Sequence, residues 1–261
     1  MFKAHLLYVS ELIAAFFQRP FMRQLARNYP RVFTFIRNRF KPGVFFGLPF
    51  TVLAILLSIN LFMLSEIAEH AVNSDEVKYF DINVSGWFFN MRTPFMSKAL
   101  YYFTQLGTFY GVTIGTIVAG LFLLLKKQWY LLLALLISVL GSSLSMYYSK
   151  IYFHRERPLN MAYFTPENSF SFPSGHATSA MALAGILCYF VLIRIENKKL
   201  RLWLFLLGVS YILLIGLSRI YLGVHFLTDV AAGYLLGLVW VIVAIGLMEY
   251  VAISKAKHKI E

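Results

Sequence analysis

The most regular feature of the chain is a series of six uncharged, strongly apolar stretches. They cover residues 44–65, 106–125, 128–149, 177–193, 202–217 and 230–248. A helix of about 20 apolar residues crosses the hydrocarbon core of a bilayer. The pattern therefore predicts an all-α, polytopic membrane protein with six transmembrane helices. The fourth and fifth stretches are short, so we expect their ends to recruit neighbouring residues.

A basic amphipathic segment precedes the first stretch. Its apolar residues recur at helical spacing, at Leu6, Val9, Ile13 and Phe16. The same segment carries eight Lys and Arg. We interpret residues 1–42 as a cytoplasmic interfacial helix lying on anionic lipids, with a disordered basic tail as the alternative. No linker divides the remaining chain, so residues 43–261 are expected to form one six-span domain.

A second interfacial helix is predicted between the first two apolar stretches. Its apolar and aromatic residues also recur at helical spacing, at Phe80, Val84, Trp87, Phe88 and Met91. The sequence "RTP" at 92–94 follows, and its proline breaks the helix. Because aromatic side chains anchor proteins at membrane surfaces, we expect this helix to lie on the outer face with its aromatics in lipid.

Composition supports the membrane assignment, and charge gives the orientation. The chain is 59% hydrophobic, whereas soluble domains are about 45–50% apolar. A net charge of +12 does not indicate nucleic-acid binding here, because basic residues collect on cytoplasmic loops of membrane proteins. With six spans, both termini and two loops share the side that holds 17 of the 24 Lys and Arg. We therefore expect a plasma (inner) membrane protein with cytoplasmic termini.

Seven Lys and Arg lie on the opposite, outer side, and four of them cluster near helix ends. These four are Lys150, Arg155, Arg157 and Arg219. Positive charge placed against the positive-inside bias indicates a specific role. Arg155, with its neighbours His154 and Glu156, is expected on a solvated face.

The first block with candidate chemistry is "KIYFHRERP", residues 150–158. Lys150 and Arg157 are seven residues apart, almost two helical turns. If the third transmembrane helix continues through this block, the two cations share one face. Pro158 would then stop the helix.

The second block is "PSGH", residues 173–176, at the start of the fourth apolar stretch. Ser174 is a good N-cap for that helix. The amides of Gly175 and His176 would then point outward at the positive end of the helix dipole. This geometry binds anions.

The third block is "SRIYLGVHFLTD", residues 218–229, between the fifth and sixth stretches. His225 and Asp229 are four residues apart and would be neighbours on a helix. All three blocks fall at the outer ends of the predicted helices, so they can meet at one depth. Cations and backbone amides suit a phosphate group. A histidine oriented by a carboxylate can act as nucleophile or base, and a second histidine can protonate a leaving group.

The three ordered blocks, Lys-x6-Arg-Pro, Pro-Ser-Gly-His and Ser-Arg-x5-His-x3-Asp, resemble those of the type 2 phosphatidic acid phosphatase family. The resemblance implies that His225 is the nucleophile, that Asp229 orients it, and that His176 protonates the leaving oxygen. It further implies a set of phosphate-binding residues: Lys150, Arg157, Ser174, Gly175 and Arg219. Ser218 would assist at the edge. The family works without a metal or other cofactor.

The resemblance implies a lipid phosphatase that removes a terminal phosphate at the outer membrane face through a phosphohistidine. Substrates in the family include undecaprenyl diphosphate, which is slightly favoured here, phosphatidylglycerophosphate, phosphatidic acid and lipid A phosphates. Phosphotransfer to another lipid would use the same residues. A headgroup or anion transporter is a further alternative, although the broken helices and repeated halves typical of transporters are not evident in the sequence. A related soluble fold binds vanadate, but six spans argue against that activity.

Overall fold

The structure is a computed structural model that describes residues 11–41, 46–164 and 169–257. No β-strand occurs in these ranges. After a helical stretch at 11–17, the elements are α2 (Pro20–Asn28), α3 (Pro30–Arg39), α4 (Leu48–Asn73), α5 (Asp75–Asn90), α6 (Pro94–Thr104), η1 (Gln105–Gly107), α7 (Phe109–Leu125), α8 (Trp129–Phe153), α9 (Gly175–Arg194), α10 (Lys198–Tyr221) and α11 (Leu227–Lys257). The all-α fold class is therefore confirmed.

The chain forms two compact units, one of Met1–Ser58 with Glu249–Glu261 and one of Ile59–Met248. The predicted domain boundary between residues 42 and 43 falls in a range that the structure does not describe, and it stays a prediction.

In the first unit, the described part of the basic N-terminal segment, residues 11–41, is largely helical but is not one helix. Prolines begin both α2 and α3, and proline suits the first position of a helix because its missing N–H would be unpaired there. Phe17 packs edge-on against Phe33, with ring centroids 5.8 Å apart. Leu6 and Val9, which contributed to the predicted amphipathic pattern, lie outside the described residues.

Five single helices are long and apolar enough to span a membrane: α4, α8, α9, α10 and α11. The sixth candidate is a bent pair, in which Pro94–Gly107 and Phe109–Leu125 meet at 51°. The predicted second span over 106–125 thus corresponds to α7 and the end of the bent helix before it. Thr108 is extended (φ −69°, ψ 166°), and its hydroxyl accepts a hydrogen bond from the Gly111 amide at 3.2 Å. This cap starts a new helix, which an apolar run alone does not reveal.

The fourth and fifth spans recruit neighbouring residues, as the sequence indicates. The apolar stretch 177–193 becomes Gly175–Arg194, and 202–217 becomes Lys198–Tyr221. Asn197 starts the latter helix, because its side chain accepts hydrogen bonds from the Lys199 and Leu200 amides, each at 3.0 Å.

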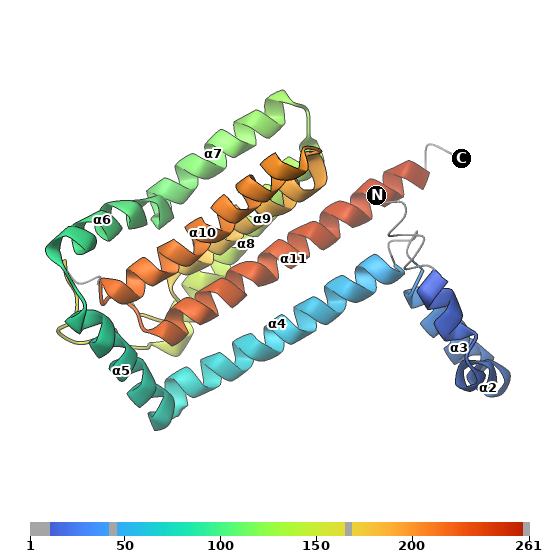
Figure 1. Cartoon of the computed structure of the whole chain (residues 1–261), viewed down its shortest axis with the longest axis horizontal. Coiled ribbons are helices and arrows are strands. Elements are labelled where there is room, and N and C mark those ends of the chain that lie inside the picture. Colours follow the sequence, from blue (N-terminus) through green and yellow to red (C-terminus); the bar gives the residue numbers. More distant parts are fainter. Residues whose placement is uncertain (1–10, 42–45, 165–168, 258–261) are drawn as a thin grey trace. The chain divides into compact units, whose positions relative to one another are not determined.

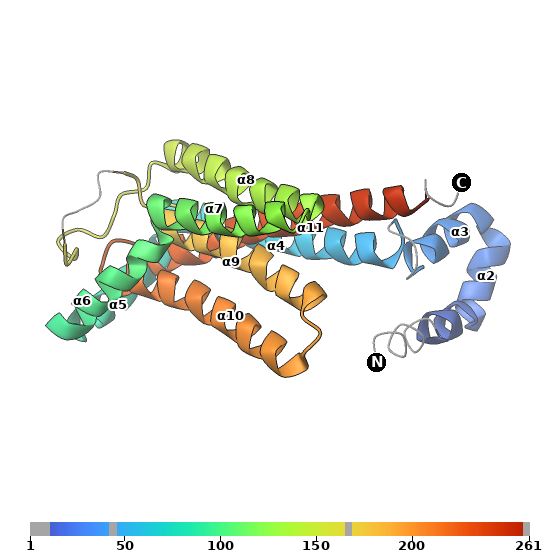
Figure 2. The ribbon, with the colours of Figure 1, turned by 90° about the horizontal axis from the view of Figure 1, so that it is seen from above.

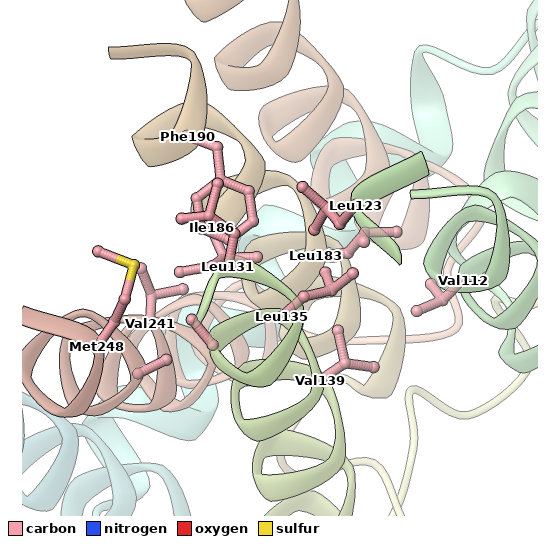
Figure 3. Close-up of a cluster of buried hydrophobic side chains, with 12 residues drawn as sticks. Val112, Leu123, Leu131, Leu135, Val139, Leu183, Ile186, Phe190, Val241 and Met248 are labelled. Carbon is pink, nitrogen blue, oxygen red and sulfur yellow. The ribbon is translucent and has the colours of Figure 1, made fainter. Parts of the chain in front are cut away.

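Within Ile59–Met248, α8, α9 and α11 run side by side around an apolar core (Figures 1 and 2). Figure 3 shows Leu131 and Leu135 of α8 meeting Ile186 of α9 in this core. Two glycines of α11 allow the close approach. A Cβ at Gly233 would lie 2.7 Å from the Ser174 carbonyl oxygen, and one at Gly237 would lie 2.6 Å from that of Thr178. Glycine at these two positions therefore lets α11 pack closely against α9.

The interfacial helix α5 lies at one end of this bundle, together with α6 and the segment that follows α8 (Figure 1). Its aromatic face is divided. Trp87 is exposed, but Val84 and Phe88 pack against a buried cluster from α9, α10 and α11. Asp81 and Ser85 are fully buried. The helix therefore presents a partly polar face to the bundle.

Candidate active site

The third sequence block forms a buried histidine–carboxylate pair. His225 precedes α11, and Asp229 lies in the first turn of that helix. Nδ1 of His225 is 3.3 Å from Oδ2 of Asp229, and these side chains are 1% and 0% exposed. The Phe226 amide donates to the same carboxylate oxygen at 3.0 Å. Gly223 allows the preceding turn, because its φ of +70° suits glycine.

The contacts of His225 assign its protonation pattern. Nη1 of Arg157 lies 3.1 Å from Nε2 of His225. A guanidinium only donates hydrogen bonds and a carboxylate only accepts them. Nδ1 therefore carries the proton shared with Asp229, and the lone pair of Nε2 faces Arg157. A neutral imidazole of this tautomer has a nucleophilic nitrogen on the side where the cations lie.

The first block reaches the site by a different path from the one predicted. α8 ends at Phe153, and His154 adopts the left-handed conformation (φ 48°). The expectation that the helix continues to Arg157 is therefore wrong. Arg157 lies in a segment that is neither helix nor strand, and its guanidinium donates to the carbonyl oxygens of Ser169 at 2.7 Å and Val224 at 2.6 Å.

Lys150, in the last turn of α8, donates to the carbonyl oxygen of Phe170. Arg157 also contacts the segment at Ser169 and Phe170. Lys150 and Arg157 thus meet at one short segment although they share no helix face.

The second block lies at the N-terminus of α9. Ser174 occupies the N-cap position, and its amide donates to the Asp229 carbonyl oxygen at 2.9 Å. The Ser174 hydroxyl does not cap the helix. Among the described residues, neither Ser174 Oγ nor Nε2 of His176 has a hydrogen-bond partner, although both are buried. Buried polar atoms are normally paired, so this geometry fits a bound group that supplies donors and acceptors.

Cations of the first and third blocks act on one histidine, His176 of the second block. The charges of Arg219, Arg157 and Lys150 interact electrostatically with the His176 ring. Nη1 of Arg219 is 3.4 Å from the Thr104 hydroxyl, and the Arg219 side chain is buried near the end of α10. The structure therefore brings the predicted histidines, carboxylate and cations to one end of the bundle.

Ser218, predicted at the edge of the site, is fully buried. Its hydroxyl donates towards the Ile215 carbonyl oxygen at 2.5 Å and lies 2.9 Å from the Thr104 hydroxyl. Within the described ranges, no group of three His, Cys, Asp or Glu side chains is arranged to hold a metal ion.

Two residues of the site were missed by the sequence reasoning. Arg155, expected on a solvated face, is only 8% exposed and bridges Asp81 and Asp229. It turns inward because the left-handed residue His154 redirects the chain after α8. Asp81 of α5 was not considered at all. The available signal was an acidic residue and a serine four apart, Asp81 and Ser85, which share one face of the helix.

Comparison with known proteins identifies the fold and its chemistry. The sequence pattern that defines the PAP2 superfamily matches residues 127–252. The chain is 34% identical over 184 residues to phosphatidylglycerophosphatase B of Bacillus subtilis, an alignment that covers 69% of this chain and 89% of that protein. It is 31% identical over 125 residues to undecaprenyl-diphosphatase of Sulfolobus acidocaldarius, covering 46% of this chain and 56% of that one.

Solved structures agree with these matches. A transmembrane PAP2-type phosphatidylglycerolphosphate phosphatase of Bacillus subtilis superposes with a TM-score of 0.69 at 26% identity, covering 74% of this chain and 96% of that chain. LpxE of Aquifex aeolicus shares the fold, with a TM-score of 0.53 at 24% identity over 64% of this chain and 94% of that one. The chain therefore belongs to the PAP2 superfamily, and it is a multi-pass membrane protein with the activity of a lipid phosphatase.

Proposed function

We propose that this protein removes the terminal phosphate of a membrane lipid in two steps, through a phosphohistidine on Nε2 of His225. The observation that carries the proposal is the buried His225–Asp229 pair, with its Nδ1–Oδ2 distance of 3.3 Å and with Nε2 facing Arg157. A histidine oriented in this way by a carboxylate is an activated nucleophile.

In the first step, the Nε2 lone pair attacks phosphorus and the bond from phosphorus to the lipid oxygen breaks. His176 gives a proton to the leaving oxygen, so the lipid leaves as an alcohol or as a shortened phosphate. In the second step, water attacks the phosphorus and the bond from phosphorus to Nε2 breaks. His176 takes the proton from that water, and inorganic phosphate is released.

The cations stabilise charge on the phosphoryl oxygens during both steps. Lys150, Arg157 and Arg219 supply positive charge, and the Gly175 amide stands at the N-terminus of α9. Arg157 donates to Nε2 of His225 in this structure. For attack on phosphorus, its guanidinium turns from Nε2 to the phosphoryl oxygens, where two parallel N–H groups suit phosphate geometry.

A cavity of about 830 Å³ next to this site suits a lipid chain, because most of its lining side chains are apolar, although Glu69 and Asn73 also line it. It lies between α4 and α8, and its wall includes Leu61, Leu64, Ala68, Phe172 and Pro173. Phe172 and Pro173 directly precede Ser174 at the N-terminus of α9. A lipid tail in this cavity would therefore leave its phosphate at the cations.

The similarity to known proteins orders the substrate candidates. The longer and more identical match is to a phosphatidylglycerophosphatase, so we infer phosphatidylglycerophosphate as the first substrate to test. Undecaprenyl diphosphate, which the sequence reasoning slightly favoured, is the second. We further infer that the site faces the outer side of the inner membrane and that the basic N-terminal segment binds anionic lipids on the cytoplasmic side.

The test is phosphate release by purified protein in EDTA from four lipids: phosphatidylglycerophosphate, undecaprenyl diphosphate, phosphatidic acid and lipid A. Wild type releases phosphate from at least one of them and forms an acid-labile, base-stable phosphoenzyme. His225→Ala does neither, while the control His70→Ala, on the exposed face of α4, matches wild type. Turnover in His225→Ala would refute the nucleophile, and loss of wild-type activity in EDTA would refute metal-free chemistry.

A further inference from the structure

The interfacial helix α5 contributes a fully buried carboxylate to the neighbourhood of the active site. Oδ2 of Asp81 accepts a hydrogen bond from Nη2 of Arg155 at 2.7 Å and another from the Thr228 hydroxyl. Oδ1 of Asp81 accepts one from the Thr228 amide at 3.2 Å. Both oxygens of Asp81 are thus bound by Thr228, the residue before the catalytic carboxylate Asp229, and one of them also by Arg155.

Arg155 joins the two carboxylates. Its Nη1 donates to Oδ1 of Asp229 at 2.5 Å and to the Thr228 hydroxyl at 2.8 Å. The guanidinium also lies over the Phe226 ring, 4.6 Å from its centroid. Each arm of the planar guanidinium therefore holds one carboxylate, which a lysine ammonium could not do from a single point.

The two oxygens of Asp229 have separate tasks. Oδ1 is held by Arg155, while Oδ2 accepts from the Phe226 amide and faces Nδ1 of His225. The direction in which Oδ2 points is consequently fixed by the bond at Oδ1. We propose that Asp81 and Arg155 are positioning residues that orient Asp229, and through it the His225 nucleophile. This inference rests on the proposed role of His225.

The charges explain why a second carboxylate is needed. Asp81 and Asp229 are each 0% exposed, and Arg155 is the cation between them. With Asp81 in place, the positive charge of Arg155 is shared between two carboxylates. Without Asp81, the whole guanidinium charge acts on Asp229, which weakens the attraction of Asp229 for the proton at Nδ1 of His225. Asp81 therefore preserves the strength of Asp229 as a partner of the nucleophile.

The first experiment compares Asp81→Asn with Asp75→Asn. Both change one carboxylate to an amide on α5, but Asp75 is 97% exposed and pairs only with Lys78 in the described contacts. For Asp81→Asn we expect kcat to fall about 10- to 100-fold, by analogy with the loss seen when outer hydrogen-bond partners of metal-ligating histidines are removed. KM changes little, because Lys150, Arg157 and Arg219 are untouched. Asp75→Asn retains both wild-type constants.

The pH–rate profile gives a signature that a purely structural role would not produce. The nucleophile must be neutral, so protonation of His225 produces the acid limb of kcat/KM. Removing the negative charge of Asp81 disfavours the imidazolium and moves this limb to lower pH. Arg155→Gln removes a positive charge and moves the limb to higher pH, whereas Arg155→Lys keeps the charge, leaves the limb in place and lowers kcat. The other charged and titratable groups of the site are common to all variants: Lys150, Arg157, His176, Arg219 and Asp229.

The outcomes separate this inference from the proposed function. If His225→Ala turns over substrate, the nucleophile assignment fails first. If His225→Ala is inactive but Asp81→Asn equals Asp75→Asn in kcat and in its acid limb, the positioning role is overturned. If Asp81→Asn does not fold, as judged by its melting in detergent, Arg155→Lys decides: wild-type kcat in that variant overturns the inference, and reduced kcat with an unmoved acid limb supports it.

Discussion

Replacing Gly233 with alanine tests whether the contact between α9 and α11 sets the geometry of the phosphate site. A Cβ at Gly233 would lie 2.7 Å from the Ser174 carbonyl oxygen, 3.0 Å from the Ala177 Cβ and 3.2 Å from the Thr178 amide nitrogen. The nearest atom belongs to the backbone at the N-terminus of α9, so no flexible side chain can move aside. The added methyl group must push the two helices apart.

The size of the displacement follows from these distances. Ordinary van der Waals contact begins at 3.4 Å, so the Ser174 carbonyl has to retreat by 0.7 Å. The Ser174 amide, on the same residue, donates to the Asp229 carbonyl oxygen at 2.9 Å, so the shift separates the N-terminus of α9 from the His225–Asp229 pair. A misplacement of about 1 Å can reduce a rate about 100-fold. We expect kcat to fall roughly 10- to 100-fold, which corresponds to about 1.4–2.7 kcal/mol in the barrier.

Stability should change less than activity. Overpacking costs roughly 1–3 kcal/mol, but alanine is favoured over glycine within a helix by about 1 kcal/mol, and the two effects partly offset each other. Phosphate release and the melting temperature in detergent are measured on the same preparations. Gly86→Ala is the matched control, because a Cβ there has nothing within 4 Å. The reasoning is refuted if Gly233→Ala keeps kcat within twofold of wild type.

Two further predictions test the cations and the orientation. Arg157→Lys should lower kcat/KM about 10- to 100-fold, because one ammonium cannot replace a guanidinium that reaches Ser169, Val224 and His225. A hydrogen bond from a charged group contributes roughly 1.5–3 kcal/mol. The control is Arg194→Lys, at an exposed helix end, and equal losses of kcat/KM in both variants would contradict the role of Arg157. In a Cys188→Ala background, a membrane-impermeant thiol reagent applied to intact cells should label Leu159→Cys and not Glu196→Cys; the reverse pattern would place the active site in the cytoplasm.

The spans and the residues that gather at their ends were predictable because both signals are local. An uncharged run of about 20 residues has few stable alternatives to a transmembrane helix. Consecutive transmembrane helices cross the bilayer in opposite directions. A block at the C-terminal end of one helix and a block at the N-terminal end of the next therefore lie on the same side of the membrane. His176, His225 and Asp229 follow from this reasoning without any side-chain geometry.

The breaks in the helices were not predictable in the same way. They depend on single residues, Thr108 and His154, whose type does not by itself indicate whether the helix continues or ends. Thr108 leaves the helix because its hydroxyl caps the next one through the Gly111 amide. His154 takes a left-handed conformation that residues other than glycine adopt only uncommonly, and α8 therefore ends four residues before Arg157. If this block is taken as one continuous helix, Lys150 and Arg157 are correctly predicted to lie near the site. The side chains after His154 are then predicted to point in the wrong directions.

That error in direction explains why Arg155 and Asp81 were overlooked. Successive residues of an α-helix are rotated by about 100° around its axis. On a continuous helix, Arg155 would therefore point away from the face shared by Lys150 and Arg157. In the structure the segment after His154 is neither helix nor strand. Arg155 reaches Asp81 of α5 and Asp229 of α11, while Arg157 reaches Val224 and His225. An unpaired buried guanidinium would be strongly unfavourable. The two carboxylates that receive Arg155 come from positions 74 residues away in the sequence on either side, and only the folded chain brings them together.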